Sequence, residues 1–416
     1  MRILIISQWF DPEPTFKGLA FARELVGRGH EVEVLTGFPN YPGGELYPGY
    51  RIRPWQRTRI DDISVLRVPL YPNHGRSVIG RVANYGSFAL SASIASAFVK
   101  RPDIIYVYHP PATIGLPAII ARLIRRAPVV YDIQDLWPDT VAATGMLTGS
   151  PVLRLIEGWC RFVYRTADRL VVLSPGFKTA LTERGVPEAK IDVIYNWCDE
   201  ASVSKSESLP VRLGKPGDFN VLFAGTMGFA QGLDAVLKAA RICAKSVPNA
   251  HFIFVGGGAD RERLARLAAD MALSNVRFLP RQPMSEIGRF LSAADVLLVH
   301  LKDDPLFRIT IPSKTQAYLA AGRPILMALR GDARDLIRRS GAGVVCEPEI
   351  PESIAAGVKE LATAGAARRE EMGRSGREFY HRELSISIGV ERFERIFRAV
   401  LDGSGCIGSQ SEPSTL

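Results

Sequence analysis

Cysteine is scarce in this sequence, and the few cysteines are scattered. The chain of 416 residues contains five of them, at positions 160, 198, 243, 346 and 406. An odd number without the close spacing of zinc ligands predicts neither a disulfide framework nor a structural metal site, and it favours a reducing cytosol. The sequence also lacks any Asp-x-Asp motif, so a carboxylate clamp for a divalent metal is not expected.

Long apolar runs are rare as well. Met1 leads into RILIIS and then into a loop with Asp11 and Glu13, which is too short and too acidic for a secretory signal. Residues 82–99 carry no charge over 18 positions, but polar residues such as Asn84 and Ser91 make them a poor membrane span. We predict a helix packed on a sheet, either a plain core helix or one that touches a membrane interface.

The positive charge is concentrated in one region. The net charge is +9, from 52 basic and 43 acidic residues. Between Arg51 and Arg126 there are 12 Lys or Arg and 3 Asp or Glu, whereas the rest of the chain balances. Such a block suits an anionic lipid surface or a pyrophosphate-bearing acceptor, and a solvated arginine-rich loop is the alternative. Nucleic acid is not favoured, because no aromatic and basic recognition motif accompanies the block.

Apolar strand patterns alternate with helical patterns in two series. With 47% hydrophobic residues, the chain can form two cores. The first series is RILIIS, EVEVLT, SVLRVP, DIIYVY, APVVYDI and RLVVLS; the second is NVLFAG, HFIFVGGG, NVRFLP, VLLVHL, PILMAL and GVVCEP. A polar stretch at 201–218 separates them and is typical of a linker. This alternation predicts parallel sheets covered by helices, in which ligands bind beyond the carboxyl ends of the strands.

Three strand-end loops of the first half hold candidate site residues. Gly18 opens a helix at 18–27, where it lets backbone amides approach a ligand or simply starts the helix. His109 follows DIIYVY, and Asp135 follows YDIQ. Both project into a cleft if the strand assignments hold; the alternatives are a histidine satisfied by backbone groups and an aspartate that caps a helix.

In the second half, the stretch 310–326, TIPSKTQAYLAAGRPIL, is predicted to be a loop, a short helix and a strand. Pro312 suits the edge of the first turn, Ser313 is a good cap, and Lys314 and Gln316 lie where free backbone N–H groups point. A helix start with a cation beside it favours an anion, although an ordinary capped helix has the same pattern. A glycine turn at 256–258 lacks the third glycine of a dinucleotide fingerprint, since Arg261 occupies that place, so NAD binding is not favoured.

Together with the glycine at 225, these loops resemble the donor-binding half of glycosyltransferase family 4. The nearest look-alikes are the WbuB-like amino-sugar transferases of bacterial surface-polysaccharide assembly, in which a proline-serine-lysine run opens the same helix. The resemblance extends from Met1 to about Leu401. It implies an α/β fold of the GT-B type, with two doubly wound Rossmann-like domains facing a central cleft. The expected boundaries are an acceptor domain at 1–200, a linker at 201–218, a donor domain at 219–383, a helix at about 384–402 crossing back to the first domain, and a disordered tail at 403–416.

The resemblance also implies roles for particular residues. The expected catalytic residues are Lys314, Arg308, Asp135 and His109. The expected donor-binding residues are Gly18, Gly225, Thr226, Gln231, Gly256, Gly257, Gly258, Leu279, Arg281, Pro312, Ser313, Lys314 and Gln316.

The chain departs from the family pattern in three places. The arginine and lysine that hold the diphosphate in many members are replaced by Thr226 and Gln231, so Arg308 and Lys314 are the natural substitutes. The family's paired glutamates fall on Ile309 and Ala317, and their contacts must come from Asp303, Asp304, Gln316 or backbone, or be lost. Gln134 occupies the position where many relatives have a histidine or arginine that contacts the donor sugar.

The expected function is transfer of a sugar, an N-acetylated or deoxy amino sugar, from a nucleotide diphosphate such as UDP or GDP to a lipid-linked or growing glycan acceptor. The reaction is expected to retain the anomeric configuration without metal or cofactor. The protein is expected to be cytoplasmic and to associate peripherally with the inner face of the plasma membrane through region 51–126. The open alternatives are a nucleotide-sugar epimerase of the same architecture and a non-catalytic protein that binds nucleotide or lipid.

Overall fold

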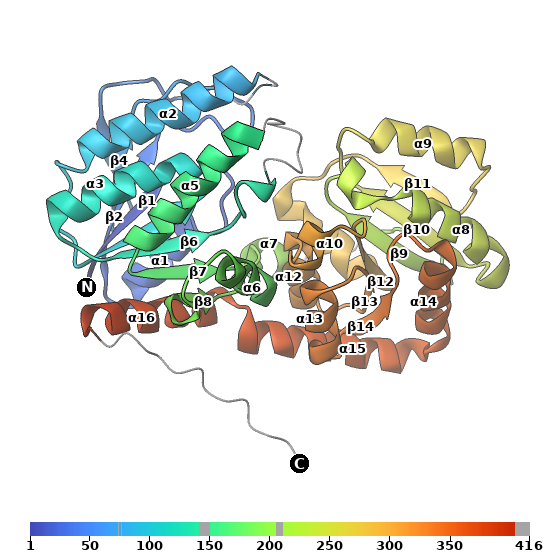
Figure 1. Cartoon of the computed structure of the whole chain (residues 1–416). Coiled ribbons are helices and arrows are strands. Elements are labelled where there is room, and N and C mark those ends of the chain that lie inside the picture. Colours follow the sequence, from blue (N-terminus) through green and yellow to red (C-terminus); the bar gives the residue numbers. More distant parts are fainter. Residues whose placement is uncertain (74, 76, 141–149, 205–210, 404–416) are drawn as a thin grey trace, which may run out of the picture. The chain divides into compact units, whose positions relative to one another are not determined.

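Two compact units make up the chain in the computed structural model (Figure 1). The structure describes residues 1–73, 75, 77–140, 150–204 and 211–403. The first unit contains Met1–Leu173, Phe177–Ile194 and the chain from Val390 onward, and the second contains Ser174–Gly176 and Tyr195–Gly389. The predicted tail lies outside the described residues except for Gly403.

The first unit is built on a sheet with the strand order β3-β4-β2-β1-β5-β6-β7-β8. All neighbours in it are parallel except the pair β3 and β4. The strands are β1 (Arg2–Ser7), β2 (Glu31–Gly37), β3 (Gln56–Ile60), β4 (Ile63–Val68), β5 (Ile104–His109), β6 (Val129–Ile133), β7 (Arg169–Val172) and β8 (Ile191–Val193). Because the chain moves from β1 to one side and then returns to β5, the strand order reverses between β1 and β5.

Helices cover both faces of this sheet. They are α1 (Leu19–Gly27), α2 (Val78–Ala95), α3 (Gly115–Arg125), α5 (Ser150–Thr166), α6 (Pro175–Glu183) and α16 (Ile386–Leu401), with the short helices η1 (Ala112–Ile114) and η2 (Glu188–Lys190). On one face, Phe21 of α1, Tyr106 of β5 and Phe393 of α16 form an aromatic cluster with ring centroids 5.0–5.4 Å apart. This cluster packs α16 against the first unit.

The second unit has a wholly parallel sheet with the order β11-β10-β9-β12-β13-β14. The strands are β9 (Phe219–Ala224), β10 (Ala250–Val255), β11 (Val276–Leu279), β12 (Val296–His300), β13 (Ile325–Ala328) and β14 (Gly343–Cys346). Nearly every residue of β9, β10 and β12 is buried, which explains why these runs are mostly apolar and do not alternate. Here the strand order reverses between β9 and β12.

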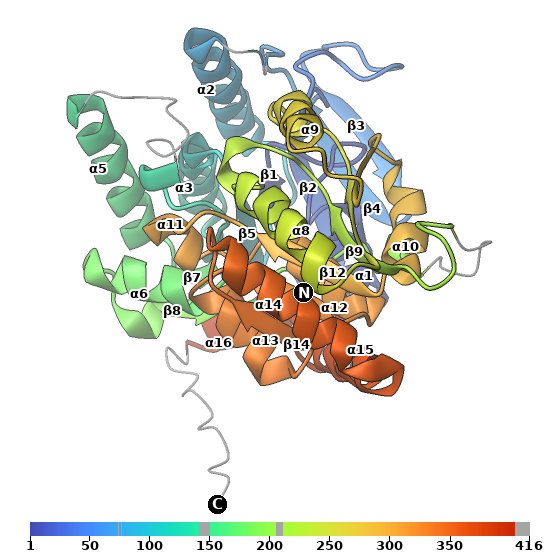
Figure 2. The same cartoon turned by 90° about the vertical axis from the view of Figure 1, so that its right-hand side faces the viewer.

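Two cores flank this second sheet, one on each face. The helices are α7 (Glu200–Ser204), α8 (Asp234–Ser246), α9 (Arg261–Asp270), α10 (Met284–Ala293), α11 (Pro305–Arg308), α12 (Ser313–Ala321), α13 (Asp332–Ser340), α14 (Pro351–Thr363) and α15 (Gly365–Glu383), with the short helix η3 (Phe229–Gln231). Figure 2 shows α8 and α14 side by side, and they contact each other. The second strand and helix series therefore forms an α/β unit of its own.

Two predicted boundaries differ from the structure. The expected linker begins with helix α7, which packs on α10 and α12 of the second unit, and residues 205–210 of the linker lie outside the described part. The chain passes into the second unit at Tyr195 rather than after residue 200. The reason is that Tyr195 and Cys198 pack in the second unit's core, a contact that the polar composition of the linker does not reveal.

Candidate functional site

The first group of candidate residues follows β9, at the point where the strand order of the second unit reverses. Ligands of doubly wound sheets bind at such points. Gly225 and Thr226 leave β9 and are exposed, whereas the next residue, Met227, is buried. The predicted donor residues at 225 and 226 are thus accessible at the carboxyl edge of this sheet.

Two glycine turns pack directly on each other at this edge. Gly256 and Gly258 have φ angles of 143° and 144°, which favour glycine. A Cβ on Gly256 would lie 2.1 Å from the Gly225 carbonyl oxygen, and one on Gly258 would lie 2.2 Å from that of Met227. Backbone N–H groups of Gly225 and Met227 donate to the carbonyls of Val255 and Gly257 at 2.9 and 2.8 Å. Close approach of the two loops therefore accounts for the glycines, whether or not a ligand is bound.

Lys314 lies against this pair of turns. A Cβ built on Gly225 would be 3.2 Å from Lys314 Nζ, and Nζ lies 3.4 Å from the centre of the Phe223 ring. The lysine is only partly buried as a residue, but its Nζ is enclosed and has no hydrogen-bond partner within the described residues. Burial lowers the pKa of Lys314 to about 7. Within the described part of the chain, the site thus holds a buried amino group without a hydrogen-bond partner, which is a feature that an anionic ligand would satisfy.

Arg308, unlike Lys314, is exposed and already has a partner of opposite charge. Its exposed guanidinium makes a bidentate ion pair with Asp303, with Nε and Nη2 at 2.8 and 3.0 Å from the two carboxylate oxygens. Asp303 also accepts from Arg330 at 2.8 Å, and Asp304 caps helix α11 by accepting from Leu306 N at 2.8 Å. The two aspartates considered as replacements for the family glutamates are therefore already engaged.

The start of helix α12 differs from the predicted cap. Pro312 is the N-cap residue and no side chain caps the helix, whereas Ser313 was expected to do so. Gln316 is buried, and with its amide nitrogen turned toward the helix start it donates to the Pro312 and Ser313 carbonyls at 2.9 and 3.0 Å. The prediction that Gln316 faces a ligand is wrong for this reason, because its own first turn uses the amide.

The remaining donor candidates have mixed environments. The Gln231 side chain accepts from Gly228 N at 2.9 Å, and its backbone oxygen lies 2.6 Å from His300 Nδ1. His300 is fully buried at the end of β12 and links the Gln231 loop to Glu349 N at 3.0 Å. No motif in the sequence pointed to His300. Leu279 is partly buried at the end of β11, and Arg281 beyond it is exposed.

In the first unit, the loop after β1 is held by side chains. Asp11 Oδ2 accepts from Leu19 N at 2.6 Å, so an aspartate eight residues earlier caps helix α1. A Cβ on Gly18 would lie 2.2 Å from Thr15 Oγ1 and 2.6 Å from this carboxylate oxygen. The glycine is needed for this packing, which favours the helix-start reading over a direct role in ligand binding.

A buried ion pair that the sequence did not predict crosses the same unit. Lys17 Nζ lies 2.6 Å from Asp132 Oδ2, and both side chains are 0% exposed although 115 residues separate them. Asp132 also accepts from Tyr106 OH and from Gln134 Nε2, each at 2.6 Å. Burial lowers the pKa of Lys17 despite the neighbouring carboxylate. Gln134, considered as a sugar contact, is thus also a partner of this pair.

A second unpredicted carboxylate is Glu13. It accepts backbone N–H groups from Asn40 and Tyr41 at 2.8 Å and from Phe10 at 3.1 Å. Burial raises the pKa of Glu13 to about 7, and these hydrogen bonds oppose the shift. The Asn40 side chain continues the network by accepting from Asn84 Nδ2 of α2 at 3.1 Å. The loops after β1 and β2 are therefore fixed to each other at the carboxyl edge of the sheet.

His109 is not accessible. The residue is 1% exposed, and its ring lies 5.8 and 6.1 Å from the rings of Tyr131 and Trp137. Neither ring nitrogen has a hydrogen-bond partner among the described residues, and burial lowers the pKa of His109 to about 3. The prediction that His109 projects into a cleft is wrong in this structure, because β5 directs the side chain into the core.

Asp135 is better placed for chemistry. It lies just after β6 and is partly exposed. Burial of its carboxyl group raises the pKa of Asp135 to about 6. Asp139, four residues later, instead forms an ion pair with Arg184. Asp135 therefore combines partial exposure with a pKa close to neutral.

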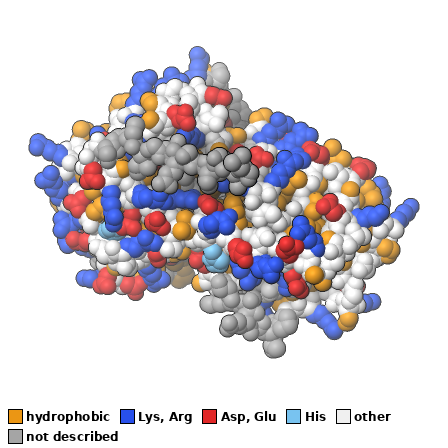
Figure 3. Space-filling view, turned by 90° about the horizontal axis from the view of Figure 1, so that it is seen from below, with side chains coloured by type: hydrophobic (Ala, Val, Ile, Leu, Met, Phe, Trp, Pro, Cys, Tyr) orange, Lys and Arg blue, Asp and Glu red, His pale blue; other side chains and the backbone are white. Residues whose placement is uncertain are grey.

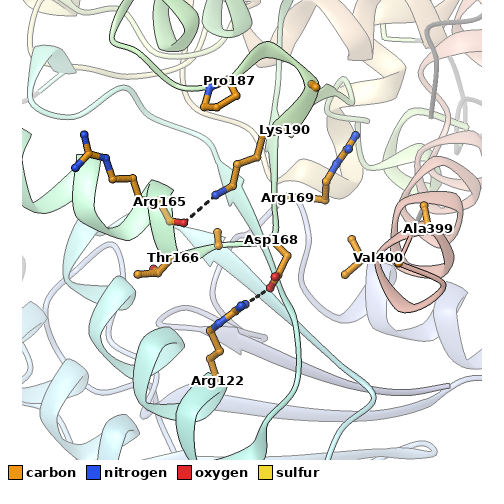
Figure 4. Close-up of a pocket in the computed structure, with 12 residues that line it drawn as sticks. Arg122, Arg165, Thr166, Asp168, Arg169, Pro187, Lys190, Ala399 and Val400 are labelled. Carbon is orange, nitrogen blue, oxygen red and sulfur yellow. Dashed lines mark hydrogen bonds and ion pairs between the residues drawn. The ribbon is translucent and has the colours of Figure 1, made fainter. Parts of the chain in front are cut away.

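A pocket of about 520 Å³ lies elsewhere in the first unit (Figure 4). It is lined at the amino-terminal ends of β7 and β8, the edge opposite to the loops described above. Its charged groups are largely engaged within the unit: Arg122 pairs with Asp168, and Lys190 Nζ donates to the Arg165 carbonyl at 2.9 Å. This pocket contains none of the predicted site residues.

Comparisons with known proteins match both halves of the chain. Residues 19–197 match the model of the glycosyl transferase 4-like domain, and residues 205–379 match that of glycosyl transferases group 1. The chain is 27% identical over 379 residues to WcaI of Escherichia coli, named as a colanic acid biosynthesis glycosyl transferase, covering 86% of this chain and 92% of WcaI. It is 25% identical over 327 residues to the glycosyltransferase WbjE of Pseudomonas aeruginosa, covering 77% and 80% of the two chains.

Solved structures share the architecture. Sucrose-phosphate synthase from Thermosynechococcus elongatus superimposes with a TM-score of 0.68 at 16% identity, covering 97% of this chain and 99% of the synthase. Anabaena HepE in complex with UDP and glucose gives a TM-score of 0.67 at 17% identity, covering 96% and 100%. Together with the two parallel-sheet units, these matches identify the chain as a glycosyltransferase with the GT-B fold, whose two halves match the glycosyl transferase 4-like and group 1 models.

Proposed function

We propose that this glycosyltransferase moves a sugar from a nucleotide diphosphate to a lipid-linked or growing glycan acceptor during assembly of a bacterial O-antigen, capsule or exopolysaccharide. The names of WcaI and WbjE and the UDP and glucose bound to HepE support a nucleotide-sugar donor and a polysaccharide product. An amino-sugar donor, UDP- or GDP-linked, is favoured by the resemblance of the run Pro312–Lys314 to that of WbuB-like enzymes. The acceptor is then a polyprenyl diphosphate conjugate at the inner face of the plasma membrane.

The enclosed ammonium of Lys314 carries this proposal. When the sugar leaves the donor, negative charge builds up on the departing diphosphate and must be stabilised. Lys314 Nζ lies beside the accessible Gly225 and has no hydrogen-bond partner in the described chain. A diphosphate oxygen there would supply both the counter-charge and the missing hydrogen bond, which raises the lysine's pKa and keeps it protonated.

Other groups would assist in defined ways. The amino-terminal end of α12, a nine-residue helix, adds a positive dipole next to Lys314. Arg308 would have to leave its bidentate pair with Asp303 to reach a diphosphate, so we assign it a secondary role. The described residues contain no group of three His, Cys, Asp or Glu side chains placed to hold a metal ion. Retention of configuration without metal or cofactor is part of the proposal.

The proposal is tested by a donor screen followed by a transfer assay. Thermal unfolding is measured with UDP, GDP, ADP and their sugars, since a ligand at 100 times its Kd stabilises by about 2.7 kcal/mol. The selected donor is then incubated with and without membrane extract from a polysaccharide-producing bacterium. We expect one nucleotide to stabilise the protein and the sugar to appear in a lipid extract only when acceptor is present. Donor conversion without acceptor would indicate an epimerase, and binding without product from any donor would indicate a binding protein.

Asp135 gives this reaction a testable pH dependence. Its pKa is raised to about 6, so the carboxylate form is lost as the pH falls through 6. If this carboxylate contacts the acceptor or the sugar in the reaction, kcat/KM rises as the pH increases through about 6. Asp135→Asn is expected to lower kcat/KM by roughly 10²–10³-fold and to remove that rise. The matched control is Asp139→Asn, because Asp139 is paired with Arg184; an unchanged pH profile in Asp135→Asn would exclude the role.

A further inference from the structure

Helices α2, α3 and α5 of the first unit expose large apolar side chains on their outer surfaces. Together with Phe98, which follows the end of α2, we call these residues the apolar helix face: Ile79, Val82, Leu90, Ile94, Phe98, Leu123, Ile124, Val152, Leu155 and Phe162. Each is at least 45% exposed, and Ile79 reaches 81%. Single exposed apolar residues are normal on soluble proteins, but a group on neighbouring helices marks an interaction surface.

Helix α2 shows the pattern most clearly. Ile79, Val82, Leu90 and Ile94 recur at spacings of three, four or eight residues, which places them on one side of the helix. The opposite side, with Phe88, is buried. A helix that is apolar on both sides normally lies inside a protein or in contact with lipid. The sheet occupies only one side of α2, so the other apolar side has no cover in the described chain.

The three helices are neighbours in the first unit. Helix α3 contacts both α2 and α5, and Figure 1 shows the three lying beside one another over the first sheet. Figure 3 shows the molecule from below. On that side basic and acidic groups are mixed and hydrophobic groups are scattered, unlike on the apolar helix face. No described helix is long and apolar enough to cross a bilayer, so the apolar helix face can only lie on a membrane and not span it.

The charges of these helices indicate which surface would cover them. The helices carry Arg81, Arg122, Arg125, Arg154, Arg161 and Arg165, against Glu157 as their one acidic residue. Two of the arginines are neutralised, since Arg122 pairs with Asp168 and Arg161 with Glu157. The remaining excess is positive. It would repel a second copy of the same face and attract an anionic surface.

An aromatic pair marks one end of the apolar helix face. Trp55 is 70% exposed and stacks on Phe98, with ring centroids 6.5 Å apart and planes at 24°. The Arg57 guanidinium donates to the Phe98 carbonyl at 3.2 Å, which places the basic segment after Arg51 beside this pair. Tryptophan next to arginine is the combination found at the level of lipid headgroups.

We propose that the apolar helix face inserts into the headgroup and acyl boundary of an anionic membrane, with its arginines contacting lipid phosphates. The inference rests on the proposed function, because a lipid-linked acceptor would be reached at the membrane surface. It also refines the expected membrane region: the insertion is carried by α2, α3 and α5, of which α5 lies outside residues 51–126. The basic loop residues near Trp55 then form the rim of the surface.

The test is flotation of the purified full-length protein with vesicles of phosphatidylcholine, with and without phosphatidylglycerol, at low and high salt. Leu90→Ser/Ile94→Ser replaces two side chains that are 62% and 70% exposed, so the fold should persist. The matched control, Met284→Ser/Ile350→Ser, replaces exposed apolar residues of the second unit. We expect wild type and control to float only with the anionic vesicles, and Leu90→Ser/Ile94→Ser to lose at least roughly tenfold in partitioning.

Donor binding and transfer to a detergent-solubilised acceptor are measured on the same variants and should not change. Equal flotation of all three proteins would overturn the inference. So would a wild-type dimer in sedimentation that Leu90→Ser/Ile94→Ser converts to a monomer without any vesicle binding, because the face would then join two copies of the chain. Vesicle binding by a protein that turns over no donor would support the membrane face while rejecting the proposed transfer, so the two failures remain distinguishable.

Discussion

Replacing Lys314 by methionine is expected to reduce donor turnover strongly and at the same time to stabilise the folded protein. Methionine keeps the length of the side chain and its contact with Phe223 but removes an enclosed ammonium that has no hydrogen-bond partner in the described chain. Loss of the charge that stabilises the leaving diphosphate should lower kcat/KM by roughly 10²–10³-fold. Removal of an uncompensated buried cation should raise the free energy of unfolding by on the order of 1–3 kcal/mol at pH 6.

The sign of the pH dependence distinguishes this explanation from simple repacking. The folded pKa of about 7 lies below the ordinary value of 10.5, so between these pH values the unfolded chain binds the proton that the folded chain has released. The stability of the wild type therefore rises with pH across this window relative to the methionine variant. The difference in free energy of unfolding between Lys314→Met and the wild type should be largest below pH 7 and should shrink toward pH 10.5. Urea unfolding at a series of pH values measures it.

A matched control for this variant is Lys238→Met, since Lys238 is an exposed lysine on helix α8 of the same unit. It should change neither turnover nor the pH dependence of stability. If Lys314→Met kept donor turnover, or if it lost stability at every pH, the assignment of Lys314 to the diphosphate would have to be abandoned.

Breaking the Lys17 and Asp132 pair is expected to have the largest effect on stability. Both side chains are fully buried, so removing one charge leaves the other without compensation. Lys17→Met and Asp132→Asn should each lower the free energy of unfolding by about 3–5 kcal/mol. The double variant removes both charges and still offers an amide oxygen to Tyr106 OH, so it should be more stable than either single variant.

The measurement can be restricted to the first unit. Four of the five tryptophans, Trp9, Trp55, Trp137 and Trp159, belong to that unit, so tryptophan fluorescence during urea unfolding reports mainly on it. Arg23→Met serves as the control, because Arg23 forms an exposed ion pair with Asp61, and pairs of this kind contribute about 0–1 kcal/mol. A double variant whose loss equals the sum of the single losses would show that the two charges do not stabilise each other.

Much of the fold was predictable because it depends on local patterns. Buried parallel strands need continuous apolar runs, and the helices between them need an amphipathic period, so both series of elements could be located from the sequence. The glycines at 225 and 256–258 were also identifiable, since a sharp turn after a strand requires backbone freedom. The same holds for the position of Lys314 at the start of a helix.

The candidate site was predicted less completely, because the state of a side chain depends on neighbours that are distant in sequence. Arg308 and Lys314 are equivalent as cations near one loop, yet the first is paired with Asp303 and the second is enclosed without a hydrogen-bond partner in the described residues. His109 was expected at the surface of a strand-end loop but lies in the core beside Tyr131. The prediction placed His109 correctly at the end of a strand, but it did not foresee that the side chain points into the core.

The sequence by itself determined the two α/β units, because apolar periodicity is a property of the chain alone. The resemblance of its strand-end loops to those of a known family added the expectation of a glycosyltransferase. Only the tertiary structure decided which charged groups are available. Lys17 pairs with Asp132, which is 115 residues away in the sequence, and α16 packs on the first unit. Three neighbouring helices of that unit each expose large apolar residues. The physical reason is that burial and charge pairing arise from contacts between distant segments, which no local pattern encodes.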